Sequence, residues 1–313
     1  MHFGTMPSMR KILRASMAPA LLGSVLAFGA TAAVAAEKAF DRTFTVTPGG
    51  MLNVNADGAY ISVAGSDANQ VVIHMVARGS QEEIDDIRMT ASQSDGGVNV
   101  ELRSDRRDWF NWSSHGQESS IEVRVPRSYR AETKTSGGDV RLESIAGPSR
   151  VRTSGGNIMA KGVKGDVDLE TSGGDVRLES MEGSIEAHTS GGNIHSASIR
   201  GDIKANTSGG DLRLLGVDGK IRASTSGGSV ECELVGANRG IMASTSGGSI
   251  RLRLPKDVAG KLEAESSGGS IDSDFPVATT HWEQNRVNGL INGGGPSIRV
   301  HTTGGGITLT AIK

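Results

Sequence analysis

The sequence predicts an all-β protein whose larger part is a β-solenoid, preceded by a β-rich capping section. The first observation is a tetrapeptide, Thr-Ser-Gly-Gly, that returns every 18 residues, which is typical of stacked repeat architectures. The second is that apolar and polar residues alternate on both sides of each tetrapeptide, as in strands with one buried face. The regular copies begin at Thr135, Thr153, Thr171, Thr189, Thr207 and Thr225, and later copies or variants at Thr245, Ser266 and Thr302.

Residues 171–188 show how one repeat is built. Val176 and Leu178 alternate with charged residues before a glycine, and Ile185 and Ala187 alternate with polar residues after it. Each 18-residue unit is therefore expected to form one coil with two strands. The threonine of each tetrapeptide is expected to point inward, where stacked hydroxyls bond to one another. Because Asp and Asn alternate after successive tetrapeptides, the sequence indicates a 36-residue duplication, and a coil of 36 residues with four strands is the alternative.

The glycines of the tetrapeptides are expected to be structural. Glycine accepts positive φ and leaves room for the backbone of a neighbouring coil. The repeat section is expected to cover residues 131–313, with an irregular insertion near 274–292 that covers the last coil. The turn glycines are Gly137, Gly138, Gly155, Gly156, Gly173, Gly174, Gly191, Gly192, Gly209, Gly210, Gly227, Gly228, Gly247 and Gly248.

Residues 37–130 lack the 18-residue period and form the expected capping section. Open ends of a solenoid are exposed strand edges, so a cover is needed there. One short helix is expected at 81–89, where Ser80 caps the first turn and Glu83 reaches back. Alternating runs predict strands at 44–46, 51–54, 60–63, 71–76, 98–102 and 121–125.

The first 36 residues are interpreted as a signal peptide, cleaved after Ala35 or Ala36, which places the protein in the periplasm or at the cell surface. A membrane anchor is the alternative; after cleavage no integral span is expected. The net charge of −2 excludes the basic footprint of a nucleic-acid binder. The signal features are Arg10, Lys11, Arg14, the apolar run 15–30 and the small residues 33–36.

No catalytic, cofactor or metal site is predicted. An Asp after some tetrapeptides is interpreted as a turn cap rather than a calcium ligand. His188 and His195 are interpreted as lone surface residues, and Cys232, at the inward position of Leu178 and Leu214, as a buried, inert thiol. Outward charges that alternate in sign indicate a self-neutralising face; they include Arg141, Glu143, Arg177, Glu179, Arg213, Arg251 and Arg253.

The tryptophans lie outside the repeats, in polar segments. Aromatic residues on the loops of a rigid scaffold are common at binding sites. Trp109, Phe110, Trp112 and Trp282 are therefore candidate contacts for a glycan or an envelope protein. The alternative is that the first three fold back and seal the end of the solenoid.

Several segments resemble the bacterial DUF4097 family, also called candidate adhesins or β-strand repeat proteins. They are residues 40–65, 121–143, the tetrapeptide repeats and 270–310. The resemblance implies a secreted or envelope-associated β-solenoid, and it brings no catalytic residues.

The function expected from these observations is that of an exported, non-enzymatic scaffold, adhesin-like or interacting with an unknown envelope protein or glycan. One alternative is an envelope-stress accessory protein that binds a membrane sensor. The other is a β-helix enzyme that acts on polysaccharides, which a clustered acidic groove would favour.

Overall fold

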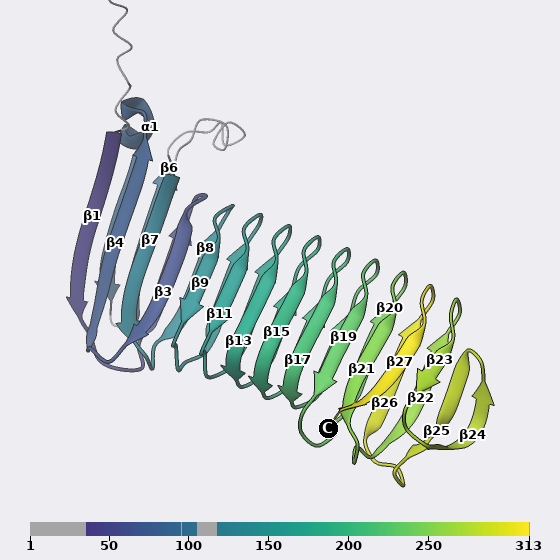
Figure 1. The fold of residues 1–313 in the computed structure, drawn as a ribbon. Coiled ribbons are helices and arrows are strands. Elements are labelled where there is room, and N and C mark those ends of the chain that lie inside the picture. The colour runs from purple at the N-terminus through teal and green to yellow at the C-terminus, as the bar shows by residue number, and fades with distance from the viewer. Residues whose placement is uncertain (1–35, 95, 105–117, 313) are drawn as a thin grey trace, which may run out of the picture. The chain divides into compact units, whose positions relative to one another are not determined.

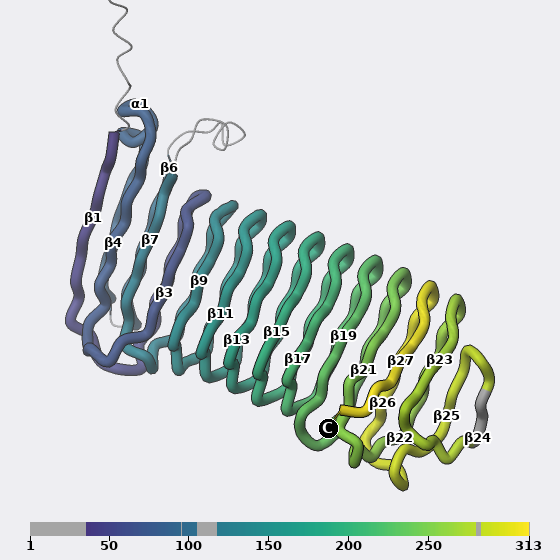
Figure 2. Tube along the Cα trace, viewed as in Figure 1, coloured from purple at the N-terminus to yellow at the C-terminus, as the bar shows by residue number. Residues whose placement is uncertain are grey.

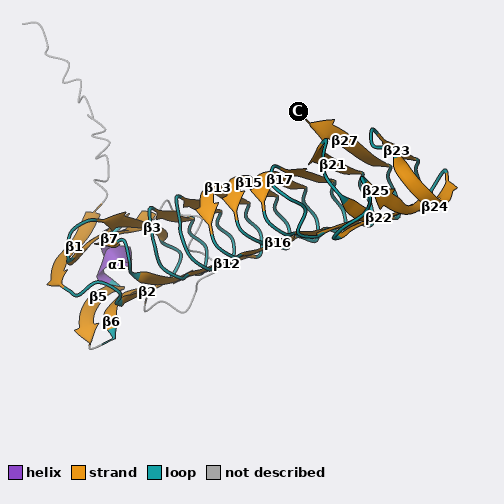
Figure 3. Cartoon of the chain, turned by 90° about the horizontal axis from the view of Figure 1, so that it is seen from below, coloured by secondary structure: helices purple, strands orange, loops and turns teal. Residues whose placement is uncertain are grey.

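Two β-sheets face each other and are connected coil by coil along the chain (Figure 1, Figure 3). The computed structural model describes residues 36–94, 96–104 and 118–312. The elements in chain order are β1 (Ala36–Thr45), β2 (Met51–Ala56), β3 (Tyr60–Ser66), β4 (Gln70–Gly79), α1 (Gln81–Asp85), β5 (Ile87–Ser94), β6 (Gly97–Ser104), β7 (Glu118–Pro126), β8 (Arg130–Thr135), β9 (Val140–Glu143), β10 (Ser149–Thr153), β11 (Ile158–Lys161), β12 (Val167–Thr171), β13 (Val176–Glu182), β14 (Ile185–His188), β15 (Ile194–Arg200), β16 (Ile203–Asn206), β17 (Leu212–Asp218), β18 (Ile221–Ser224), β19 (Val230–Leu234), β20 (Ile241–Thr245), β21 (Ile250–Pro255), β22 (Gly260–Ser266), β23 (Ile271–Ser273), β24 (Val277–Glu283), β25 (Arg286–Ile291), β26 (Ser297–Thr302) and β27 (Ile307–Ile312).

Each repeat contributes one strand to each sheet. Among the described residues, sheet A has the strand order β1-β4-β7-β3-β9-β11-β13-β15-β17-β19-β21-β27-β23, and sheet B has the order β24-β25-β22-β26-β20-β18-β16-β14-β12-β10-β8-β2-β6-β5. Ile158 pairs in parallel with Val140 on one side and with Val176 on the other. Neighbouring strands are thus 18 residues apart, which confirms the 18-residue, two-strand coil and rules out the 36-residue alternative.

The threonines of the tetrapeptides point inward as expected, but their hydroxyls do not bond to one another. The Thr171 hydroxyl donates to the carbonyl of Gly156 in the preceding coil at 2.8 Å, and the Gly174 amide donates to the same hydroxyl at 3.3 Å. The same bond to the preceding coil recurs at Thr153, Thr189, Thr207, Thr225 and Thr245. A hydroxyl ladder is therefore the wrong expectation, because the hydroxyls satisfy backbone groups at the turns instead.

The two glycines of each tetrapeptide differ. A Cβ on Gly174 would lie 2.1 Å from the carbonyl oxygen of Gly156, whereas a Cβ on Gly173 would lie 3.8 Å from the nearest atom, the Gly155 carbonyl oxygen. Neither residue has a positive φ; that conformation occurs instead in the second turn of the coil, at Gly183. Close approach of coils, and not positive φ, therefore explains the second glycine.

The N-terminal elements extend both sheets outward with antiparallel strands. On sheet A, β4 pairs with β7 and β1 with β4; on sheet B, β5 pairs with β6. Strand β5 was not expected from the sequence, and of β1 only the end was expected. The expected cap of the helix is present, with Ser80 and Glu83 forming a capping box, but α1 ends at Asp85 because Ile87 already begins β5.

Strands β2 and β3 form a coil of the stack although they lack the tetrapeptide. They pair in parallel with β8 and β9 on one side and with β6 and β7 on the other. The turn Ala56–Ala59 occupies the place of a tetrapeptide, since Ala56 pairs with Thr135. The parallel stack of coils therefore crosses the predicted boundary between the capping section and the repeat section at residue 130 without a break.

The C-terminal strands are inserted between coils that precede them in sequence. In sheet A, β27 pairs with both β21 and β23, and in sheet B, β26 pairs with both β20 and β22. Figure 2 shows this as the yellow end of the chain lying between greener strands. The hairpin of β24 and β25 then extends sheet B beyond β22.

The core lies between the sheets and is filled by the inward residues of both. Leu178 and Leu214 of sheet A and Leu169 of sheet B are all fully buried. Cys232 pairs in register with Leu214 and is 1% exposed. Burial raises the pKa of its thiol to about 12, which confirms the expectation of an inert, buried cysteine.

Candidate functional site

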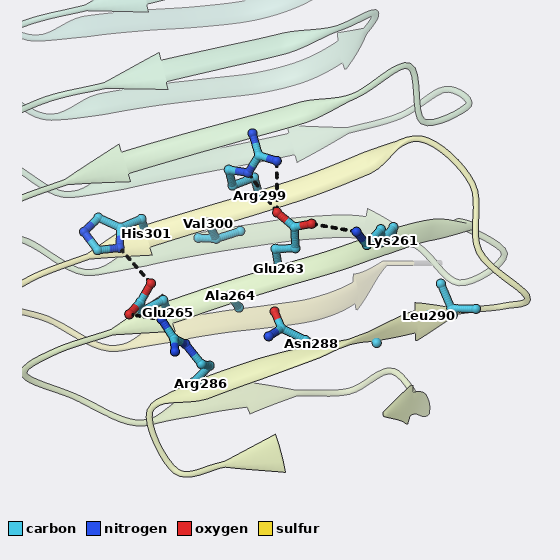
Figure 4. Close-up of a pocket in the computed structure, with 11 residues that line it drawn as sticks. Lys261, Glu263, Ala264, Glu265, Arg286, Asn288, Leu290, Arg299, Val300 and His301 are labelled. Atoms are coloured by element: carbon cyan, nitrogen blue, oxygen red, sulfur yellow. Dashed lines mark hydrogen bonds and ion pairs between the residues drawn. The ribbon is translucent and has the colours of Figure 1, made fainter. Parts of the chain in front are cut away.

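A depression of about 700 Å³ lies on the solvent face of sheet B near its C-terminal end (Figure 4). Strands β22, β25 and β26 line it with their outward side chains. We call this depression the C-terminal pocket. Its charged and polar residues are Lys261, Glu263, Glu265, Arg286, Asn288, Arg299 and His301.

Glu263 lies between two cations at the centre of the pocket. It pairs in register with Arg299 of β26, whose Nε and Nη2 atoms are both 3.0 Å from Glu263 Oε2. Lys261 Nζ lies 2.9 Å from the other carboxylate oxygen. Hydrogen bonds from Lys261 and Arg299 lower the pKa of Glu263, so this carboxylate is held in its charged form.

Glu265 contacts the remaining basic side chains of the pocket, Arg286 and His301. It pairs in register with His301 of β26 and with Arg286 of β25. Arg286 Nη2 lies 2.6 Å from Glu265 Oε1, and His301 Nδ1 lies 3.9 Å from the other oxygen. Figure 4 shows Glu263 directed toward Arg299 and Lys261, and Glu265 directed toward Arg286 and His301.

This arrangement suits recognition better than acid–base catalysis. The pocket has three fixed cations and two carboxylates, and each carboxylate is already hydrogen-bonded to a cation. A general acid needs a carboxyl group whose pKa is raised, whereas that of Glu263 is lowered. The described part of the chain also holds no group of three His, Cys, Asp or Glu side chains placed to bind a metal ion.

The backbone of one predicted contact residue lies on the strand next to β25. Trp282 belongs to β24, where its backbone pairs with Val287, the buried residue between the pocket residues Arg286 and Asn288. Its contact role stays a prediction. Trp109, Phe110 and Trp112 lie outside the described residues, so their role stays a prediction. The pocket itself was not predicted from the sequence. Its only signal is the alternation of charged and apolar residues at 261–265, which does not indicate the partners on β25 and β26.

The residues that follow the tetrapeptides act as turn caps, as expected, and they do so between coils. The backbone amide of Asn157 donates to Asp139 Oδ1 at 2.7 Å, and that of Asp175 donates to Asn157 Oδ1 at 2.8 Å. Asn193 and Asp211 continue the series in the same way. We call these residues the Asx ladder.

The prediction of a self-neutralising outer surface is confirmed for most of the charges. Ion pairs connect neighbouring coils, such as Arg150 with Asp168 at 2.9 Å and Arg213 with Glu231 at 3.3 Å. His188 and His195 lie on the outer faces of different sheets, also as expected. Arg177 and Arg251 are exceptions: no ion pair connects either of them to any residue that the structure describes.

The profile of the Toastrack DUF4097 family matches residues 51–310. The chain belongs to this family. None of the curated proteins matches the sequence.

Solved structures to which the chain is similar include candidate adhesins of Parabacteroides distasonis and Bacteroides fragilis. The first has 13% identity and a TM-score of 0.51, covering 87% of this chain and 97% of its own. The second has 14% identity and a TM-score of 0.43, covering 88% and 97%. A candidate lipid-binding protein of P. distasonis has 11% identity and a TM-score of 0.45, with coverage of 88% and 97%. At such identities the P. distasonis adhesin supports the Toastrack fold alone.

Proposed function

We propose that this Toastrack protein is an exported, non-enzymatic scaffold that binds an envelope glycan or envelope protein in an adhesin-like role. The observation that carries the proposal is how the side chains are distributed between the two sides of each sheet. Inward residues of both sheets are buried in one continuous core, which leaves the outer faces and the ends for interaction. The names given to the structural neighbours are consistent with such a role.

The contact surface that we propose is the C-terminal pocket together with strand β24. The pocket offers fixed cations and carboxylates, which hydrogen-bond well to sugar hydroxyls or to polar groups of a protein. Trp282 is on the adjacent strand, and tryptophan is a residue type enriched at interfaces. Trp109, Phe110 and Trp112 are proposed as a second contact.

The two alternatives are distinguished from this proposal in different ways. A membrane-sensor accessory would bind its partner through the same outer surfaces, so only the identity of the captured partner distinguishes it. A polysaccharide-acting enzyme would need a carboxyl group with a raised pKa facing a carboxylate. In the C-terminal pocket both carboxylates instead contact cations. Within the described residues, no helix combines the length and hydropathy needed to cross a bilayer.

The test is a pull-down in which the immobilised, purified mature protein is exposed in parallel to envelope extract and to isolated cell-wall glycan. We expect the protein to retain a component of one of the two. Trp282→Ala should abolish this retention without lowering the melting temperature. Trp282→Phe is the matched control, because it keeps an aromatic ring and should retain binding. A large fall in melting temperature would instead assign Trp282 a packing role, and unchanged capture by Trp282→Ala would remove this surface from the proposal.

A further inference from the structure

A second depression, of about 500 Å³, lies on the solvent face of sheet A beside the tetrapeptide turns. It crosses five neighbouring strands, β3, β9, β11, β13 and β15, which Figure 1 shows side by side. At about 4.8 Å between strands, the five strands span about 19 Å. Tyr60 lies at one end and His195 at the other, and the Asx ladder runs along one side. We call this depression the ladder groove.

The Asx ladder presents a continuous row of amide and carboxylate groups. Asp175 Oδ1 accepts from the Asn193 backbone amide at 2.7 Å and from the Asn193 side-chain amide at 3.2 Å. Asn157 makes the same two bonds to Asp139. These bonds orient carboxylate groups that accept hydrogen bonds and amide groups that can also donate them, and sugar hydroxyls can pair with both.

Cations recur beside the ladder on every second coil. Arg141, Arg177 and Arg213 are 36 residues apart, so they repeat at about 10 Å along the groove and its continuation. Arg141 contacts Glu143 and Arg213 contacts Glu231, but Arg177 has no ion pair with any described residue.

His195 lies between Arg177 and Arg213 on the intervening strand. Burial, followed by the charges of Arg177 and Arg213, lowers the pKa of its imidazole, while Glu231 opposes this effect. Two cationic side chains thus flank this position on the neighbouring strands, although the net charge of the chain is −2.

We propose that the ladder groove binds a linear acidic polysaccharide, with an acidic group of the polymer at the His195 end of the groove, where it contacts Arg177 and Arg213. The hydroxyl groups would bond to the Asx ladder, and one sugar ring would pack on Tyr60, which is 38% exposed. Arginine is the side chain best suited to a carboxylate or sulfate, because its guanidinium offers two parallel donors.

A densely charged polymer fits this groove poorly. Polyphosphates and nucleic acids bind through many unopposed cations. Here the carboxylates of Asp139 and Asp175 lie within the groove and would repel closely spaced phosphates. A polymer with sparse acidic groups and many hydroxyls matches cations that occur only on alternate coils.

The test is isothermal titration with hyaluronate, which carries a carboxylate only on every second sugar, and with fully methyl-esterified hyaluronate as the uncharged counterpart. Hyaluronate should bind, and esterification should weaken its binding about tenfold or more. Polygalacturonate and alginate, which carry a carboxylate on every sugar, should bind more weakly than hyaluronate. Arg177→Gln should weaken binding about tenfold, because it removes one charge-assisted contact. Arg222→Gln is the matched control, since Arg222 is also exposed and without an ion pair among the described residues but lies on sheet B.

Thermal melting should be unchanged in both variants, because neither arginine supports the fold through an ion pair. Arg213→Gln provides a second variant on the other side of His195. The proposal is overturned if hyaluronate does not bind, if its esterified form binds equally, or if Arg177→Gln and Arg222→Gln behave alike.

This inference rests on the proposed function only in that both assign an external partner to the outer faces. The two fail separately, because Trp282→Ala should leave titration with acidic polymers unchanged. Loss of envelope capture in that variant alone would support the proposed function without bearing on the ladder groove.

Discussion

At the scale of single residues, coils touch backbone to backbone at the second glycine of each tetrapeptide. A Cβ on Gly174 would meet the carbonyl oxygen of Gly156 at 2.1 Å, so Gly174→Ala must push two coils apart. We expect the free energy of unfolding to fall by about 3 kcal/mol, the upper range for overpacking. Chemical denaturation of the purified protein measures this.

Gly173→Ala is the matched control, one residue away. Its Cβ would meet only atoms at van der Waals distance, 3.8 Å or more, and its φ is not positive. Its stability should be unchanged or raised by up to about 1 kcal/mol, because alanine restricts the unfolded chain. Equal losses in the two variants would contradict the proposed difference between the two glycines.

At the scale of elements, the Asx ladder explains why Asp and Asn alternate along the sequence. Successive ladder residues belong to neighbouring strands about 4.8 Å apart, where two carboxylates would repel. Each Asn separates two Asp residues and gives its side-chain amide to the preceding one. The 36-residue pattern in the sequence is therefore a charge pattern on an 18-residue coil.

Asn193→Asp tests this account by placing carboxylates on three successive coils, with Asp175 and Asp211 on either side. It also removes the 3.2 Å bond from the Asn193 amide to Asp175. We expect a loss of about 1–2 kcal/mol at low salt, shrinking as ionic strength rises.

Asn193→Ser provides the comparison, because it keeps an uncharged acceptor, as Ser229 does naturally for Ser249. Its cost should be smaller than that of the aspartate and independent of salt. A salt-independent loss in Asn193→Asp would show that the missing hydrogen bond, and not charge repulsion, sets the cost.

The elements that sequence could predict are those whose information is local. The alternation at Val176, Leu178 and Ile185 specifies strands and their buried faces, and the repeat length specifies the register. The order of strands at the ends is not local, because β26 pairs with β20 and β22 only after the chain has passed both. The C-terminal pocket depends on this order, since Arg299 and His301 reach Glu263 and Glu265 across that pairing.

At the scale of the whole molecule, the described stack is interlocked near both ends. The coil of β2 and β3 lies between β6/β7 and β8/β9, and the coil of β26 and β27 lies between β20/β21 and β22/β23. Terminal repeats of a solenoid have only one neighbour and tend to fray. Placing an early and a late segment one coil inward gives each of them two neighbours.

Deletion of residues 297–313 tests the importance of this interlock. It removes Ile298, Val300, Ile307 and Leu309, all at most 1% exposed, whose burial contributes about 6–12 kcal/mol together. That is comparable to the whole stability of a typical domain, so the outer strands β22 to β25 should lose their protection in amide hydrogen exchange. Strands β9 to β17 should keep theirs, because repeat proteins are stabilised chiefly by neighbouring coils. Deletion of Lys313 alone is the control and should change nothing; persistent protection of β22 to β25 in the longer deletion would show that these strands fold without the inserted coil.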